Sequence, residues 1–110
     1  MKNIPVVTTE QIANHNIAEH LGLVRGNTIR ARHLGCDILA GFRNIVGGEI
    51  HEYTKLMAES REQAIDRMVD EARQLGADAI VNVRFSTSMV AQGAAEILVF
   101  GTAVKLVKSA

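Results

Sequence analysis

Hydrophobic positions along the chain follow two periods, and the longer period predicts a helix. Between Glu49 and Leu75, apolar side chains recur every three or four residues, the spacing of one face of an α-helix. Arg67 and Glu71 are four residues apart and are expected to pair on the solvent side. Gly76 follows directly, where a glycine typically ends a helix. The apolar stripe consists of Tyr53, Leu56, Met57, Ala64, Ile65, Met68, Ala72 and Leu75.

The shorter period, an alternation of two, and runs of β-branched residues predict four strands. These strands cover Pro5–Thr9, Ile17–Val24, Ala79–Ser88 and Ala95–Val107, and Gly26-Asn27 is predicted to form a turn after the second. Strict alternation in the third strand would place one set of side chains on a common face, namely Ala79, Val81, Val83 and Phe85.

The fourth strand is apolar on both faces, which is unusual for a small antiparallel sheet. Ile97 and Val99 point to one side, and Leu98 and Phe100 point to the other. One helix covers only one face, and a sheet in a monomer usually leaves its second face polar. We therefore predict a two-layer α+β subunit that covers the second face with another copy of itself.

The segment from Gly22 to Gly48 contains six of the nine glycines. Within it, Asp37 is a plausible N-cap for a short helix over 37–46, which Gly47-Gly48 would end. This segment has a local net charge of +3, whereas residues 49–75 have a net charge of −3. The difference could mark an anion-binding site, but we favour complementary surfaces that meet between subunits.

Composition and charge exclude several classes of function. The 110 residues carry no net charge and only four aromatic side chains, which argues against binding to nucleic acid or to a membrane surface. A single cysteine, Cys36, rules out an internal disulfide, and no secretory leader is recognisable, so a cytoplasmic protein is expected. Phosphate-binding loops and nucleophile elbows are absent from the sequence, and we expect no enzymatic activity.

Soft metal binding is the most specific chemistry that the residues allow. His33 and Cys36 form a His-x₂-Cys pair, and imidazole and thiolate are ligands that Zn²⁺ and Cu⁺ prefer. Two donors are too few for a closed tetrahedral site, so several subunits would have to contribute. The alternative is a buried thiol beside a surface imidazole. The other histidines lack a second donor at suitable spacing and are expected to be exposed or locally hydrogen-bonded; they are His15, His20 and His51.

Several blocks of the sequence, in the right order and spread over nearly the whole chain, resemble the YbjQ family. They are Leu21–Arg32, Ala40–Ile50 with Glu52–Thr54, Leu75–Val81 and Gly101–Val104. The resemblance implies one domain over 1–110, with a small antiparallel sheet and one long helix, similar to a dodecin subunit, assembled as a homopentameric ring. The family is described as heavy-metal-binding, and the resemblance implies no catalytic activity.

The resemblance also points to residues that build an interface or a ligand pocket. They belong to the glycine-rich segment and are Arg25, Gly26, Asn27, Arg30, Gly41, Arg43, Gly47 and Gly48. Two functions follow from these observations. The first is a ring that binds a heavy-metal ion or another small ligand. The second is a ring that serves only as a scaffold or binds a partner, without metal.

Overall fold

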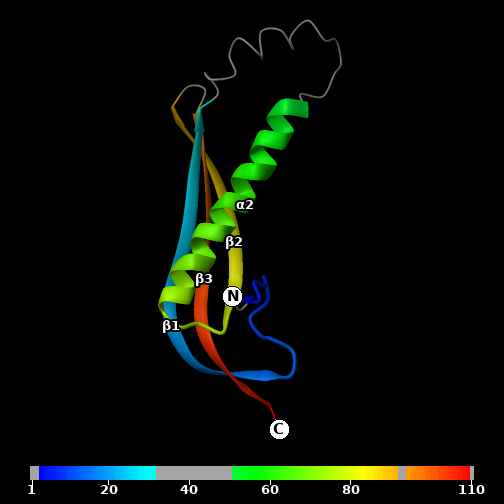
Figure 1. Ribbon diagram of the computed structural model, residues 1–110, viewed down its shortest axis with the longest axis vertical. Helices are drawn as coiled ribbons and strands as arrows, with labels where there is room; N and C mark the ends of the chain where they lie inside the picture. The colour runs from blue at the N-terminus through cyan, green and yellow to red at the C-terminus, as the bar shows by residue number, and fades with distance from the viewer. Residues whose placement is uncertain (1–2, 32–50, 92–93, 110) are drawn as a thin grey trace, which may run out of the picture.

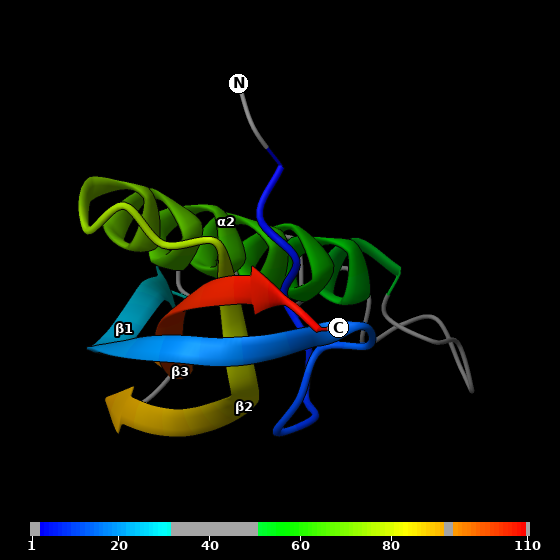
Figure 2. The ribbon, with the colours of Figure 1, turned by 90° about the horizontal axis from the view of Figure 1, so that it is seen from below.

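The computed structural model describes residues 3–31, 51–91 and 94–109, which form one sheet and one long helix. Strand β1 covers His15–Ala31, β2 covers Ala79–Ala91, β3 covers Ala94–Lys108, and helix α2 covers His51–Gln74. The strands are antiparallel in the order β1-β3-β2, and α2 lies across one face of the sheet (Figures 1 and 2). The predicted two-layer α+β architecture is therefore confirmed.

The predicted turn at Gly26-Asn27 is wrong, because β1 continues through these residues. Gly26 pairs with Val99 and Asn27 pairs with Leu98, and the pairing runs on to Ala31. Glycine and asparagine are typical turn residues. Here the glycine has a different role, since it lets α2 approach the strand closely.

The first predicted strand, Pro5–Thr9, does not form a full strand. It is a short segment that runs parallel to β2 and bonds to its edge. Val6 forms an isolated bridge with Ile80. The amide of Val7 donates to the carbonyl of Ile80 at 3.0 Å, and the amide of Asn82 donates to the carbonyl of Thr9 at 3.0 Å. The short helix predicted over 37–46 lies outside the described residues.

A β-bulge overturns the predicted alternation in the third strand. Val81 pairs with Thr102 and Arg84 pairs with Phe100, so β2 has one residue more than β3 in this interval. The bulge shifts the following side chains of β2 to the opposite face as far as Met89, where a second shift of register occurs. Val81 therefore packs in a cluster on the sheet's outer face, away from α2, whereas Val83 packs under the helix.

The core lies between α2 and the sheet and contains mainly small and medium aliphatic side chains. Met68 is its largest fully buried side chain, and Ala64 and Ala72 lie on the same face of the helix. From the sheet, Ile97 and Val99 face α2, whereas Val104 and Leu106 belong to the outer cluster, so the predicted division of this strand into two faces is confirmed. This second cluster sits at the end of the sheet where the N-terminal segment joins it.

The subunit is elongated for its size. Its radius of gyration is 17.7 Å, with extents of 60 × 24 × 24 Å. A compact chain of this length would have a radius of gyration of about 13 Å. A sheet in such an elongated subunit leaves more of its surface exposed than a sheet in a compact domain does.

Candidate functional site

Gly26 is the contact point between β1 and α2. A Cβ built on Gly26 would overlap the carbonyl oxygen of Ala64 and would stand 2.6 Å from the amide nitrogen of Met68. Helix and strand therefore meet backbone to backbone, and no larger residue fits. Of the glycines predicted to form an interface or pocket, this one builds the contact between the two layers of a single subunit.

Two side chains of α2 bond to the open edge of β1 next to Gly26. Glu71 Oε1 accepts a hydrogen bond from the amide of Arg25 at 3.3 Å, and Arg67 Nη1 donates to the carbonyl of Asn27 at 2.6 Å. The prediction that Arg67 and Glu71 pair with each other on the solvent side is therefore wrong. Instead, they satisfy backbone groups that an edge strand would otherwise present to another chain.

The remaining predicted interface residues do not gather into one pocket within the described residues. The side chain of Asn27 donates to Glu96 Oε2 at 3.1 Å on the outer face, and the side chain of Arg25 is exposed. Arg30 lies near the end of β1. The other members of the set lie outside the described residues; they are Gly41, Arg43, Gly47 and Gly48.

No metal-binding group of three or more His, Cys, Asp or Glu side chains occurs within ranges 3–31, 51–91 and 94–109. His33 and Cys36, the predicted ligands, lie outside these ranges. His15 is exposed and its Nδ1 lies 2.8 Å from the carbonyl oxygen of Ala13, which confirms the expectation of a local hydrogen bond. His20 is exposed, also as expected.

Apart from Val107 near the end of β3, the large apolar side chains exposed on the described part of the sheet form two groups. Leu23 and Ile29 lie on the outer face of β1 and are 61% and 56% exposed. Phe85, Met89 and Val90 lie on the distal half of β2, defined here as residues 84–91, and are 47%, 68% and 51% exposed. Neither group is covered by α2, which packs mainly on β1 and β3 (Figure 1).

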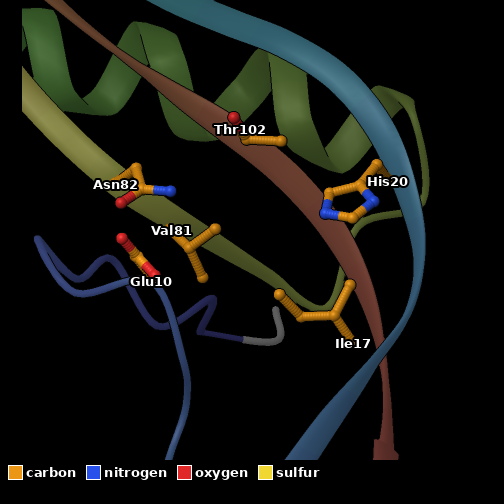
Figure 3. A pocket seen from close by; sticks show the side chains of 6 residues that line it. All are labelled: Glu10, Ile17, His20, Val81, Asn82 and Thr102. Carbon is orange, nitrogen blue, oxygen red and sulfur yellow. The ribbon is translucent and has the colours of Figure 1, made fainter.

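A hollow of about 280 Å³ opens on the outer face, beside the N-terminal segment (Figure 3). Its floor contains the apolar side chains of Ile17 and Val81, and its polar lining comes from four different parts of the chain. The polar residues are Glu10, His20, Asn82 and Thr102. Sequence reasoning missed this site because its residues are up to 92 positions apart and share no motif.

Within the described residues, one helix packs on a three-stranded antiparallel sheet, which defines a class of small α+β proteins. A protein with unknown function of the DUF74 family from Pediococcus pentosaceus has a similar crystal structure, with a TM-score of 0.62. The alignment covers 94% of this chain and 98% of that one at 14% sequence identity. At this identity, the similarity establishes the fold and nothing about activity.

The family follows from the sequence comparisons. Residues 4–107 match the model of a family, YbjQ, described as "Putative heavy-metal-binding", and the chain belongs to this family. The chain is 57% identical to a UPF0145 protein of Archaeoglobus fulgidus over 105 residues, covering 96% of this chain and 97% of the relative. It is 58% identical to a UPF0145 protein of Methanosarcina acetivorans, covering 92% of this chain and 95% of the relative. The resemblance stated from the sequence is thereby confirmed.

Among the residues that the structure describes, no helix combines the length and the apolar character required to cross a membrane.

Proposed function

We propose that this protein is a cytoplasmic, homo-oligomeric binding protein, a pentameric ring that takes up a soft metal ion such as Zn²⁺ or Cu⁺. It carries out no catalytic step. The observation that carries the proposal is the exposure of Phe85, Met89 and Val90 on the distal half of β2. Large apolar side chains exposed along one stretch of strand are typical of interaction surfaces, and a second copy of the chain is the partner available to every subunit.

The two edges of the sheet differ in a way that supports assembly through β2. The edge of β1 is blocked near its centre by Arg67 and Glu71. The N-terminal segment bonds to the edge of β2 only from Ile80 to Val83. Within the described residues, the backbone groups of the distal half therefore remain open to a neighbouring strand. An edge with open groups and exposed apolar side chains is suited to pairing with another chain.

Charge complementarity supports the same arrangement. The glycine-rich segment 22–48 carries +3 and residues 49–75 carry −3. In a ring, each subunit presents one surface to its neighbour on one side and a different surface on the other. Opposite charges on the two surfaces favour this contact over the contact between like surfaces.

The metal would be held by His33 and Cys36 from more than one subunit. Within the described residues, no three-donor group offers an alternative site. In a ring, equivalent residues of adjacent subunits can converge, so that two donors per chain suffice for the four ligands that Zn²⁺ prefers. The family description points to the same class of ligand.

A scaffold ring without metal is the second candidate, and Cys36 distinguishes the two. Removing the thiol by Cys36→Ser abolishes metal uptake if the metal site exists, and it changes nothing in a metal-free scaffold. Substitution of His15, an exposed imidazole outside the predicted ligand pair, by Asn is the matched control and should leave uptake intact.

Native mass spectrometry of the purified protein, before and after addition of Zn²⁺ or Cu⁺, tests both parts. A fivefold mass that gains a fixed, saturable number of ions supports the ring and the metal site. A fivefold mass with only non-saturating adducts supports the ring and rejects the metal. A stable monomer at micromolar concentration rejects the ring.

A further inference from the structure

Three irregularities of the sheet converge on the hollow of the outer face. The bulge in β2 contains Asn82, which has a φ of 55°. Two shifts of register in β1 flank His20, one between Ile17 and Glu19 and one between His20 and Gly22, where φ is 122°. Bulges and left-handed backbone are less stable than regular strand, and they commonly redirect side chains at functional sites.

The bulge in β2 also fixes the segment that carries Glu10. The amide of Asn82 donates to the carbonyl of Thr9 at 3.0 Å, and Arg84 Nη1 donates to the carbonyl of Thr8 at 2.9 Å. Thr9 Oγ1 in turn donates to the carbonyl of Gln11 at 2.7 Å. The backbone on both sides of Glu10 is therefore held, and Glu10 is one of the residues that line the hollow.

The polar groups around the hollow have unused hydrogen-bonding capacity. Among the described residues, the side chains of Glu10, His20, Asn82 and Thr102 make no hydrogen bond or ion pair. Figure 3 shows Glu10 and Asn82 on one side of the hollow and His20 on the other, with Val81 between them. The half-buried side chain of Ile17 provides most of the apolar surface between the two polar sides, and Val81, which is only 2% exposed, lies beneath it in the lining.

We propose that this hollow binds a small organic cation. A protonated amine would bond to the Glu10 carboxylate and the Asn82 amide oxygen, and a short aliphatic stem would lie over Ile17 and Val81. A hydroxyl or similar group at the far end would bond to His20 or Thr102. Among the lining residues that the structure describes, the Glu10 carboxylate is the one fixed charge, so a cation is favoured over an anion.

The dimensions separate this site from the metal site proposed above. A volume of about 280 Å³ is near the lower limit for small-molecule pockets and far larger than one metal ion. Its residues do not include His33 or Cys36, and the two proposals stand or fall independently.

The probe is aminopentanol with its two polar groups at opposite ends of the stem. Its binding is monitored by the NMR chemical shifts of the ¹⁵N-labelled full chain. Because the site is open, we expect binding in the millimolar range, with shifts concentrated at residues 10, 20, 81, 82 and 102. Pentanediol, which has the same stem without charge, and the anion hydroxyvalerate are expected to bind at least about fivefold more weakly.

Two variants test the assigned contacts without disturbing the fold. Glu10→Gln removes the charge at constant size and should weaken aminopentanol binding about fivefold. Asn82→Gly removes the amide and keeps a residue that tolerates the positive φ, and it should also weaken binding. Glu62→Gln, which alters an exposed carboxylate on α2, is the matched control and should bind as the unmodified chain does.

Any of the following results would overturn the proposal. The first is equal affinity for the cation, the diol and the anion. The second is unchanged binding after Glu10→Gln. The third is a set of shifts spread over the surface, or nuclear Overhauser contacts showing that a neighbouring subunit fills the hollow. Zn²⁺ displacing aminopentanol from the same residues would likewise reject an organic cation as the ligand in favour of a metal.

Discussion

Gly26 in β1 lies against the backbone of Met68 in α2, so that a Cβ on Gly26 would stand 2.6 Å from the Met68 amide nitrogen. The same Cβ would approach the Cβ of Arg67 to 3.0 Å. Real Cβ atoms do not tolerate such distances to backbone atoms, and a helix backbone cannot move without its neighbours. The separation of the two layers is therefore determined at this position.

Gly26→Ala should destabilise the fold by about 3 kcal/mol, because the added methyl group forces α2 away from the sheet and loosens the core around Met68. Ala18→Ser, at an exposed position of the same strand, is the control and should change stability by less than about 0.5 kcal/mol. Urea denaturation of both variants measures the difference. A Gly26→Ala protein as stable as the unmodified chain would show that the two layers can separate without cost.

Thr28→Val should cost about 1 kcal/mol, although the two side chains have nearly the same shape. Thr28 is buried, and its hydroxyl donates to the carbonyl of Ser60 at 3.2 Å across the interface between strand and helix. Valine cannot donate this bond and leaves the carbonyl with one partner fewer. The control, Thr87→Val on the exposed part of β2, should be neutral. Equal unfolding free energies of the two variants would contradict the prediction.

Glu71→Ala should increase hydrogen exchange at the amide of Arg25. That amide lies on the edge of the sheet, and the Glu71 carboxylate is its acceptor at 3.3 Å. Without this acceptor, the amide is open to water. Its protection from hydrogen exchange should then fall towards that of an edge-strand amide without a hydrogen bond. Glu62→Ala, on an exposed part of the same helix, serves as the control. If Arg25 exchanged at the same rate in both variants, the helix would not block this edge.

Met89→Lys should weaken self-association, because it puts a charge on an apolar side chain that is 68% exposed on the distal half of β2. We expect the apparent dissociation constant of the oligomer to rise at least about tenfold, which corresponds to about 1.4 kcal/mol per interface. Analytical ultracentrifugation over a dilution series provides the measurement. The control is Glu62→Lys on α2, and an equal effect of the two substitutions would place the interface elsewhere.

The helix could be predicted almost to the residue from sequence alone. Its apolar positions repeat at the helical period over 24 residues, and Gly76, with a φ of 78°, follows where the chain leaves it. The two faces of β3 were also predicted correctly, since that strand lies in the middle of the sheet and pairs on both sides. Both elements depend on periodicity within a continuous segment, and periodicity is the information that a sequence displays most directly.

The errors all arise where contacts between distant segments override local preference. Gly26 and Asn27 have the composition of a turn, but β3 and α2 hold them in an extended strand. The alternation of β2 breaks at Asn82 because a bulge there accommodates the N-terminal segment. Arg67 and Glu71 have the spacing of a helical pair, but the edge of β1 offers them backbone partners that the spacing does not reveal.

The sequence by itself determined the class of fold, the family and the requirement that apolar surface on both faces of the sheet be covered. Only the tertiary structure decided where the two layers touch, which edge is blocked, and which polar groups meet around the hollow. The physical reason is that periodicity and composition are properties of neighbouring residues. A bulge, a backbone contact at Gly26 or the proximity of Glu10 to Asn82 exists only after segments far apart in the chain have packed together.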